Sequence, residues 1–247
     1  MDLGLTGTRA LVTAASKGLG RACAAALAAE GARVLIVSRD EERLAHVERE
    51  ISASGHLALD LAHADSPAKA VAAAVDTLGG LDILVCNAGG PPPGNFESTP
   101  LERWDAGYQL TLMSAVRLSK AALPHLKESR RGRIVNITSI SVRQPVANLV
   151  LSNAFRSAVT AMAKTLSAEL APFGATVNNL APGMVLTDRI RQLYGDDLTD
   201  LEKSIPMGRL GRPEEFGATC AFLCSLQAGY ITGQSIGIDG GAVRGVH

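Results

Sequence analysis

An excess of charge and long apolar runs are both missing from this chain of 247 residues. Lys and Arg together number 24, as do Asp and Glu, so the formal net charge is zero. Nucleic-acid-binding domains normally carry a basic excess, and none is present. No apolar run approaches the roughly 20 residues of a membrane-spanning helix. We therefore expect neither a nucleic acid nor a membrane as a partner.

Cysteine is scarce, with four residues and no CxxC pair. Cys220 and Cys224 are four positions apart on an expected helix, where buried packing thiols are the usual explanation. The first residues show no basic region followed by an apolar segment, so no secretory signal is expected. These features fit a reducing cytoplasm. The histidines, to which no metal or catalytic role is assigned, are His46, His56, His63, His125 and His247.

Short apolar runs alternate with longer amphipathic segments, and no linker interrupts them. Runs that are apolar throughout, such as 34–37, are typical of parallel strands buried on both faces. The alternation predicts one α/β domain over 1–247, a doubly wound parallel sheet of about seven strands with helices on both faces. The expected strands are Arg9–Thr13, Arg33–Ser38, Leu57–Asp60, Ile83–Cys86, Arg133–Ile137, Thr176–Leu180 and Ser235–Ile238. The expected helices include Gly18–Ala29, Glu41–Ala53, Pro67–Leu78, Leu101–Leu126 and Leu149–Leu170.

A glycine-containing turn joins the first expected strand to the first helix. Its sequence is Thr13-Ala14-Ala15-Ser16-Lys17-Gly18-Leu19-Gly20. Gly18 and Gly20 would let the backbone approach a pyrophosphate, and the helix N-terminus offers free N–H groups to it. Glycines also serve tight strand–helix turns for geometry alone. The position directly after an N-terminal strand favours the phosphate-binding interpretation.

This turn resembles the TGxxxGxG turn of the short-chain dehydrogenase/reductase family, with Ala14 in place of the first glycine. The added methyl group is expected to be tolerated. The resemblance covers nearly the whole chain and implies a Rossmann-type fold with a nicotinamide cofactor. The further matching motifs are Asp60-Leu61, Asn87-Ala88-Gly89, Asn136, Pro182-Gly183 with Thr187, Thr232-Gly233-Gln234 and Asp239-Gly240-Gly241. The implied cofactor-binding residues are Thr13, Ser16, Lys17, Gly18, Leu19, Gly20, Ser38, Arg39, Asp60, Leu61, Asn87, Ala88, Gly89, Arg156, Pro182, Gly183 and Thr187.

The end of the second expected strand bears on the choice of cofactor. An acid there usually binds the ribose hydroxyls of NAD, whereas a nearby Arg accommodates the phosphate of NADP. Asp40 lies at that distance, but Asp40-Glu41-Glu42 is also the pattern of a helix N-cap with an acidic first turn. Ser38 leaves room for a phosphate, which Arg39 and Lys17 could contact, although Arg39 could equally be a surface charge. The sequence favours NADP(H), with NAD(H) as the alternative.

The catalytic positions depart from the family's pattern. Family enzymes use a Tyr as proton donor, a Lys that lowers its pKa, a Ser that orients the carbonyl, and an Asn that supports a proton relay. By resemblance Ser139 matches the Ser, whereas Ser152, Arg156 and Thr111 stand at the Tyr, Lys and Asn positions. An aliphatic hydroxyl does not titrate near neutrality as a tuned phenol does. Losing a positioned general acid typically costs about 10²–10⁴ in rate.

Three other side chains are candidates for the missing functional groups. Tyr108 and Tyr194 could supply a phenol, although packing is the first interpretation of each. Arg143 could hold an acidic substrate or polarise a carbonyl, but a solvated loop arginine is the favoured interpretation. The polar segment Thr187–Arg209 is a candidate substrate lid.

The resemblance implies an NADP(H)-dependent oxidoreductase acting on a carbonyl or alcohol substrate, similar to 3-oxoacyl-[acyl-carrier-protein] reductases. Its altered catalytic positions predict weak or rewired activity. The alternatives are a catalytically silent protein that binds a dinucleotide or another ligand, and a structural partner of an active homologue. The resemblance also implies a homo-oligomer, dimer or tetramer, that assembles through its two long helices.

Overall fold

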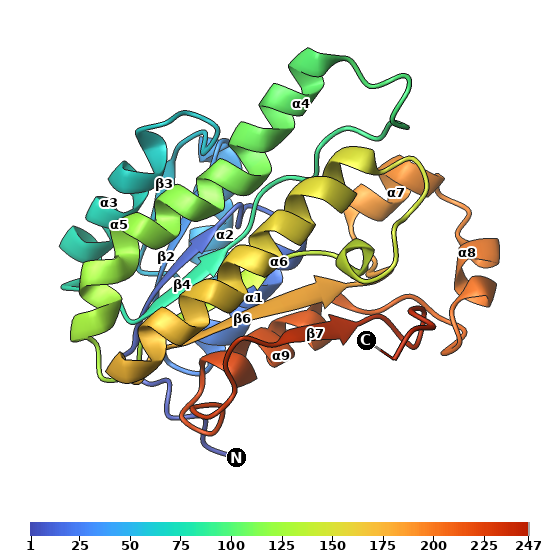
Figure 1. Ribbon diagram of the computed structural model, residues 1–247. Helices are drawn as coiled ribbons and strands as arrows, with labels where there is room; N and C mark the ends of the chain where they lie inside the picture. The colour runs from blue at the N-terminus through green and yellow to red at the C-terminus, as the bar shows by residue number, and fades with distance from the viewer. Residues whose placement is uncertain (247) are drawn as a thin grey trace.

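The computed structural model describes residues 1–246, and its seven strands form one parallel sheet with the order β3-β2-β1-β4-β5-β6-β7 (Figure 1). The chain moves outward in one direction from β1 to β3 and in the other from β4 to β7. The strand order therefore reverses between β1 and β4, where ligands of such sheets usually bind. The strands are β1 (Arg9–Thr13), β2 (Arg33–Ser38), β3 (Gly55–Ala58), β4 (Ile83–Cys86), β5 (Arg133–Ile137), β6 (Thr176–Pro182) and β7 (Ser235–Ile238). This arrangement confirms the predicted Rossmann-type, doubly wound sheet.

Helices cover both faces of the sheet (Figure 1). One core cluster joins the sheet to α1, α2 and α9, and the other joins it to α3, α5 and α6. The helices are α1 (Gly18–Ala29), α2 (Glu41–Ile51), α3 (Ser66–Leu78), α4 (Leu101–Gly107), α5 (Ser114–Glu128), α6 (Val150–Leu170), α7 (Asp188–Tyr194), α8 (Thr199–Ser204) and α9 (Pro213–Cys224). A π-helix, η1 (Tyr108–Met113), and two short 3-10 turns, η2 (Ile140–Val142) and η3 (Ala171–Phe173), complete them.

Strand β1 shows why an uninterrupted apolar run fits this sheet. Ala10 and Val12 belong to the cluster on one face, whereas Leu11 belongs to the cluster on the other. Side chains of a strand point alternately to opposite faces, so both faces must be apolar when helices cover both.

Of the helices in residues 1–246, none is long and apolar enough to cross a membrane.

Two elements differ most from the expectations, and several other boundaries shift by one or two residues. The third strand is Gly55–Ala58 and not Leu57–Asp60, because the backbone at 55–58 is the part that pairs with β2. The expected helix Leu101–Leu126 is divided by the π-helix η1, and helical structure continues to Glu128. A π-helical turn keeps the backbone hydrogen-bonded while changing which side chains share a face, and such turns are frequent at functional sites.

The glycine-containing turn carries backbone strain at Ala14. Its φ of 47° lies in the left-handed region, which costs a residue with a Cβ about 1–2 kcal/mol. Glycine removes this strain but loses more entropy on folding, by about 0.4–1 kcal/mol. We therefore expect Ala14→Gly to raise the free energy of unfolding by about 0.5–1 kcal/mol, measured by urea denaturation.

The neighbouring residue supplies the control. Ala15 is fully buried and has no positive φ, so Ala15→Gly should destabilise the protein by about 0.5–1 kcal/mol. Equal destabilisation by the two substitutions would contradict the assignment of strain to Ala14.

Candidate functional site

A cleft of about 990 Å³ lies at the carboxyl ends of the strands, where the strand order reverses. Its walls come from the glycine-containing turn, the ends of the central strands, the start of α6 and most of α7. Most of the predicted site residues line it together. They are Ser16, Lys17, Gly18, Leu19, Ser38, Arg39, Asp60, Leu61, Asn87, Ala88, Gly89, Ser139, Ser152, Arg156, Pro182, Gly183 and Thr187.

The start of α1 presents unoccupied backbone donors to this cleft. Lys17 is the N-cap residue, yet no side chain caps the helix and no acidic residue stands in its first turn. The first N–H groups of a helix need partners and attract anions. Gly18 has a φ of 56°, and a Cβ there would lie 3.7 Å from Thr187. The cleft therefore contains a helix terminus that could attract an anion, next to Thr187.

Two predicted cofactor-binding residues lie behind the turn and do not line the cleft. Thr13 donates a hydrogen bond from its hydroxyl to the Asn87 carbonyl at 2.8 Å and accepts one from the Asn87 N–H at 2.9 Å. A Cβ on Gly20 would lie only 2.3 Å from the Ala14 carbonyl oxygen, so glycine is needed for packing of α1 on the turn. Both residues position the turn.

One end of the cleft is polar and contains the exposed side chain of Arg39. The Ser16 and Ser38 hydroxyls lie 2.8 Å apart. Arg39 is 72% exposed and lies 3.9 Å from Asp60, so its guanidinium is only loosely held. Asp40 accepts a hydrogen bond from the Arg43 N–H at 3.1 Å as the N-cap of α2. The N-cap interpretation of Asp40 is thus confirmed.

The other end of the cleft brings together Ser139, Ser152 and Arg156. The Ser139 oxygen accepts a hydrogen bond from the Ser141 N–H at 3.1 Å. Its own O–H therefore remains available to donate into the cleft. Ser152 is buried near the start of α6, one helical turn before Arg156.

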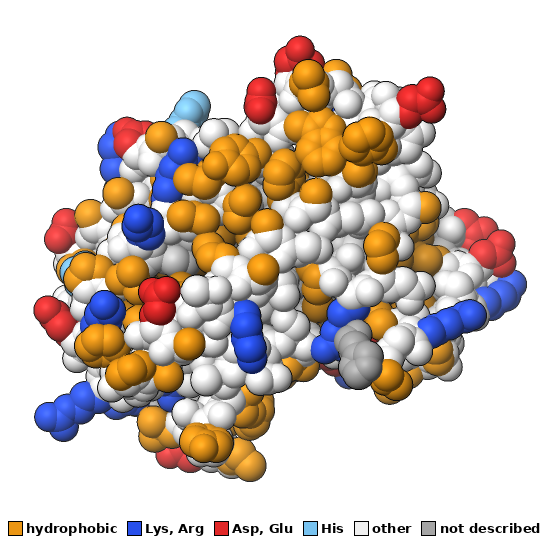
Figure 2. Space-filling model, in the orientation of Figure 1, with side chains coloured by type: hydrophobic (Ala, Val, Ile, Leu, Met, Phe, Trp, Pro, Cys, Tyr) orange, Lys and Arg blue, Asp and Glu red, His pale blue; other side chains and the backbone are white. Residues whose placement is uncertain are grey.

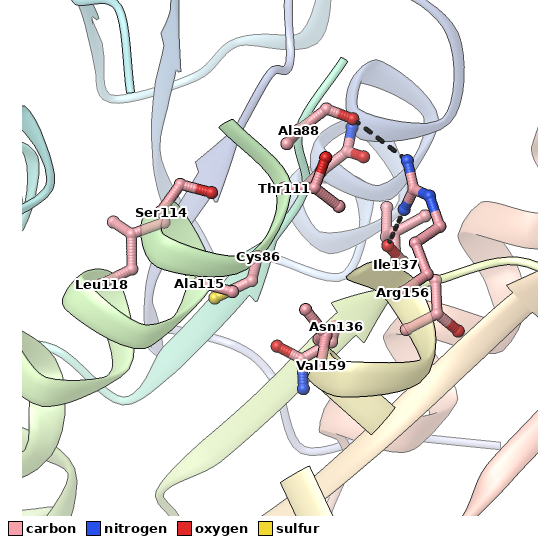
Figure 3. A pocket seen from close by; sticks show the side chains of 12 residues that line it. Cys86, Ala88, Thr111, Ser114, Ala115, Leu118, Asn136, Ile137, Arg156 and Val159 are labelled. Carbon is pink, nitrogen blue, oxygen red and sulfur yellow. Dashed lines mark hydrogen bonds between the residues drawn. The ribbon is translucent and has the colours of Figure 1, made fainter. Parts of the chain in front are cut away.

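The Arg156 guanidinium is held by backbone carbonyls and not by a carboxylate. It donates hydrogen bonds to the Ile137 carbonyl at 2.6 Å and the Ala88 carbonyl at 3.5 Å (Figure 3). Burial, and secondarily the positive charge of Arg189, lower the pKa of Arg156 to about 10. The group is still charged at neutral pH, and an anion beside it would be stabilising.

Thr111 lies outside the cleft, on the other side of Arg156. It belongs to η1 and lines a separate cavity of about 20 Å³ that Arg156 also lines (Figure 3). The Thr111 hydroxyl and the Asn136 side-chain oxygen have no hydrogen-bond partner among residues 1–246, and both residues line this cavity. A cavity of roughly this size accommodates about one water molecule. Burial raises the pKa of the adjoining Cys86 thiol to about 12, which keeps it neutral.

Of the three other candidates, Tyr108, Tyr194 and Arg143, one lines the cleft. Tyr108 packs against Phe155, with ring centroids 6.2 Å apart, and does not line the cleft. Tyr194 does line it and is 42% exposed. Arg143 is exposed and donates to the Ser235 carbonyl, away from the cleft. Within residues 1–246, no cluster of His, Cys, Asp or Glu could hold a metal ion, and His247 lies outside the described residues.

Arg189 is a charged lining residue that the sequence analysis did not single out. It stands at the start of α7 and donates a hydrogen bond to the Pro91 carbonyl at 2.7 Å, across the cleft. Burial lowers the pKa of Arg189. Its position directly after Thr187-Asp188 could have indicated that it lies near the cleft. The direction of its side chain, however, depends on how α7 crosses the cleft.

Comparison with known proteins places this geometry in a family. The model of the family described as "Enoyl-(Acyl carrier protein) reductase" matches residues 13–243. The chain is 35% identical to the 3-oxoacyl-[acyl-carrier-protein] reductase FabG of Vibrio cholerae over 97% of this chain and 98% of that protein.

Solved structures of similar proteins support the same family assignment. L-sorbose reductase from Gluconobacter frateurii, complexed with NADPH and L-sorbose, has a TM-score of 0.93 at 29% identity, covering 100% of both chains. A short-chain dehydrogenase from Burkholderia cenocepacia, complexed with NADP, has a TM-score of 0.90 at 32% identity, covering 96% of this chain and 98% of that one. With its parallel sheet, glycine-containing turn and matching motifs, this chain belongs to the short-chain dehydrogenase/reductase family.

Proposed function

We propose that this protein is an NADP(H)-dependent oxidoreductase for a carbonyl or alcohol substrate, similar to 3-oxoacyl-[acyl-carrier-protein] reductases, with altered proton-transfer groups. The observation that carries the proposal is the cleft itself. An uncapped helix terminus, a loosely held Arg39 and the Ser139 hydroxyl all line the same 990 Å³ space. That arrangement suits an elongated anionic dinucleotide beside a small carbonyl compound.

The residues present fit a phosphorylated dinucleotide. The α1 terminus and Lys17 would hold the pyrophosphate, and Ser38 with Arg39 would hold the additional phosphate. Asp60, Leu61 and Asn87–Gly89 would contact the adenosine and ribose side, while Pro182–Thr187 would contact the nicotinamide. Two structural relatives, the L-sorbose reductase and the Burkholderia dehydrogenase, contain NADPH and NADP respectively, which supports NADP(H) over NAD(H).

When bound, the nicotinamide supplies or accepts the hydride. The chain's own residues orient the substrate carbonyl and provide for its proton. Ser139 donates a hydrogen bond to the carbonyl oxygen, which is possible because its acceptor side already holds the Ser141 N–H. Arg156 binds ribose hydroxyls and adds positive charge beside the developing alkoxide.

The proton donor is the weak part of this site. Ser152 stands where the family's Tyr is expected, and a serine hydroxyl does not titrate near neutrality. Arg156 stands at the Lys position and stays protonated, so it does not exchange protons as a Lys–Tyr pair does. We propose that water supplies the proton and that turnover is correspondingly slow. This weakness is also what favours the alternative of a silent dinucleotide-binding protein.

The test is turnover of a substrate panel by the wild-type protein. β-Keto esters, diketones and sugars would be incubated with NADPH, and its oxidation followed by absorbance. Slow but protein-dependent oxidation supports the proposed function. Tight NADPH binding without turnover would leave the silent binding protein, and absence of binding to NADPH and NADH would leave a structural partner of an active homologue.

Cofactor preference gives a second test. Ser38→Asp places a carboxylate where the additional phosphate of NADP would lie and where an acid binds the NAD ribose. Losing one or two charge-assisted contacts is expected to weaken NADPH binding by about 10–100-fold relative to NADH, measured by fluorescence titration. Asparagine has nearly the size of aspartate but no charge, so Ser38→Asn should retain most of the preference for NADPH over NADH. An unchanged NADPH/NADH ratio in Ser38→Asp would contradict the assignment.

Assembly and location belong to the same proposal. Hydrophobic side chains gather on the surface over α4 (Figure 2), where Phe96, Leu101 and Tyr108 are exposed. Trp104 packs between Phe96 and Phe155, with centroid distances of 6.0 Å and 5.8 Å. An exposed aromatic surface of this kind supports a homo-oligomer, dimer or tetramer. The four cysteines are all free and buried, which supports a cytoplasmic location.

The lid is proposed to cover residues 187–209 within a single domain. Its first helix, α7, is attached at both sides of the cleft, through Asp188 to Lys17 at 3.6 Å and through Arg189 to Pro91. A third small apolar cluster, Ile190, Leu198, Ile205 and Leu210, packs this segment together with the residue that follows it.

A further inference from the structure

More cationic than acidic side chains line the cleft. Each acidic residue of the lining has a cation beside it: Asp40 with Arg43 at 3.0 Å, Asp60 with Arg39 at 3.9 Å, and Asp188 with Lys17 at 3.6 Å. Arg156 and Arg189 also line the cleft, but neither forms an ion pair with any carboxylate in residues 1–246. The cleft therefore contains two guanidinium groups in excess of its acids.

These two guanidiniums both donate to the loop that follows β4. Arg156 donates to the Ala88 carbonyl, and Arg189 donates to the Pro91 carbonyl in the same loop after β4. A Cβ on Gly90 would lie 3.3 Å from the Arg189 guanidinium. Their charges also interact, because Arg189 contributes to the lowered pKa of Arg156.

Arg156 lies on α6, away from the expected phosphate positions. The pyrophosphate is expected at the start of α1, beside Lys17, and the additional phosphate beside Ser38 and Arg39 at the end of β2. The loop at 88–91 follows β4, on the other side of the switch point from β2. Arg156 stands one turn after Ser152 on α6, and Arg189 donates to the same loop after β4, so both are available to the end of the cleft where the substrate would react.

Two half-buried like charges without an acidic partner are unfavourable unless an anion joins them. A carboxylate matches the geometry of planar guanidinium forks and can offer one oxygen to each of two arginines. Arg156 has five N–H donors, of which two contact backbone carbonyls, so donors remain for a ligand.

We propose that Arg156 and Arg189 together bind the carboxylate of a small carbonyl substrate, such as a keto acid. This inference rests on the oxidoreductase function proposed above and names its substrate class. Arg189 is then a specificity-determining residue supplied by the lid. Substrate binding would attach α7 more firmly over the reacting end of the cleft.

The experiment compares a keto acid with its neutral ester. Binding of acetoacetate and of methyl acetoacetate would be measured from the rise in melting temperature at constant ionic strength. Both the protein alone and the protein saturated with NADP⁺ would be used. We expect wild type to bind acetoacetate about tenfold or more tightly than the ester, because charge-assisted hydrogen bonds are lost in the ester.

Two variants on α7 form a matched pair. Arg189→Gln should lower the ratio of acetoacetate to ester affinity by about tenfold, whereas Arg191→Gln should leave that ratio as in wild type. Arg191 is exposed, does not line the cleft and lies 3.6 Å from Asp196. Arg189→Lys keeps the charge without the planar fork and should give an intermediate ratio.

Several results would overturn the inference. They are equal affinity for acid and ester in wild type, equal effects of the two α7 variants, and stronger binding of inorganic phosphate than of acetoacetate. Loss of NADP⁺ binding in Arg189→Gln with the acid/ester ratio unchanged would instead assign the arginine to the cofactor. If wild type binds no NADP⁺ at all, the proposed function fails, while the acid/ester ratio of the protein alone still decides this inference.

Discussion

Combining Ser152→Tyr, Arg156→Lys and Thr111→Asn is expected to raise the rate of NADPH-dependent carbonyl reduction by about 10²–10⁴. The variant returns a phenol, an ammonium and an amide to the positions that the family resemblance assigns to them. Ser152 lines the cleft, so a tyrosine there has space to extend. The measurement is kcat for the best substrate of the panel, compared with wild type under the same conditions.

The control for this variant keeps the shape and removes the acid. It combines Ser152→Phe with Arg156→Lys and Thr111→Asn, and differs from the restored enzyme by one hydroxyl. It should be no faster than wild type. If wild type already turns over faster than the restored variant, or if the phenylalanine variant gains equally, the account of a missing proton donor is wrong.

Arg156→Met is expected to stabilise the protein without ligand. A pKa near 10 in place of 12.5 corresponds to a penalty on the order of 3 kcal/mol on the charged group in the fold. Because the depressed pKa belongs to a cation, this penalty is fully present below pH 10 and disappears as the pH rises from 10 towards 12.5. Part of the gain is offset, since the Ile137 carbonyl loses its donor. We expect a net gain of about 1–2 kcal/mol at pH 7, or about 3–6 °C in Tm.

An arginine on the surface provides the comparison. Arg33 also donates to two backbone carbonyls, those of Leu78 at 2.8 Å and Thr77 at 3.1 Å, but it is exposed. Arg33→Met should therefore leave Tm unchanged or lower it slightly. If Arg156→Met lowers Tm to the same degree as Arg33→Met, the buried charge of Arg156 does not destabilise the folded protein. Stabilisation would indicate that Arg156 is retained for binding at the expense of stability.

Much of the fold could be predicted because the deciding signals are local. Apolar runs mark the buried strands, and their alternation with helices implies a parallel, doubly wound sheet. The π-helix η1 left no mark in the sequence, because the apolar periodicity continues through it from Leu101 to Leu126. Thr111, which the resemblance assigns to the catalytic set, lies in this π-helix and lines a small cavity that Arg156 also lines.

The cleft-facing residues were predictable where a motif follows a strand. Ser38, Asp60 and Asn87 each stand at or after the carboxyl end of a strand, and such ends meet at one edge of a parallel sheet. Arg189 and Tyr194 depend on how α7 folds back over that edge, which no local pattern specifies. Sequence alone therefore gave Tyr108 and Tyr194 equal weight, although only the latter lines the cleft.

The central claim is that the cleft still binds a phosphorylated dinucleotide although its proposed phenol and ammonium positions hold serine and arginine. The most direct measurement is the dissociation constant of the wild-type protein for NADPH and for NADH, from parallel fluorescence titrations at the same salt concentration. We expect saturable binding of both, with NADPH about 10–100-fold tighter. Absence of saturable binding of either nucleotide would contradict the claim.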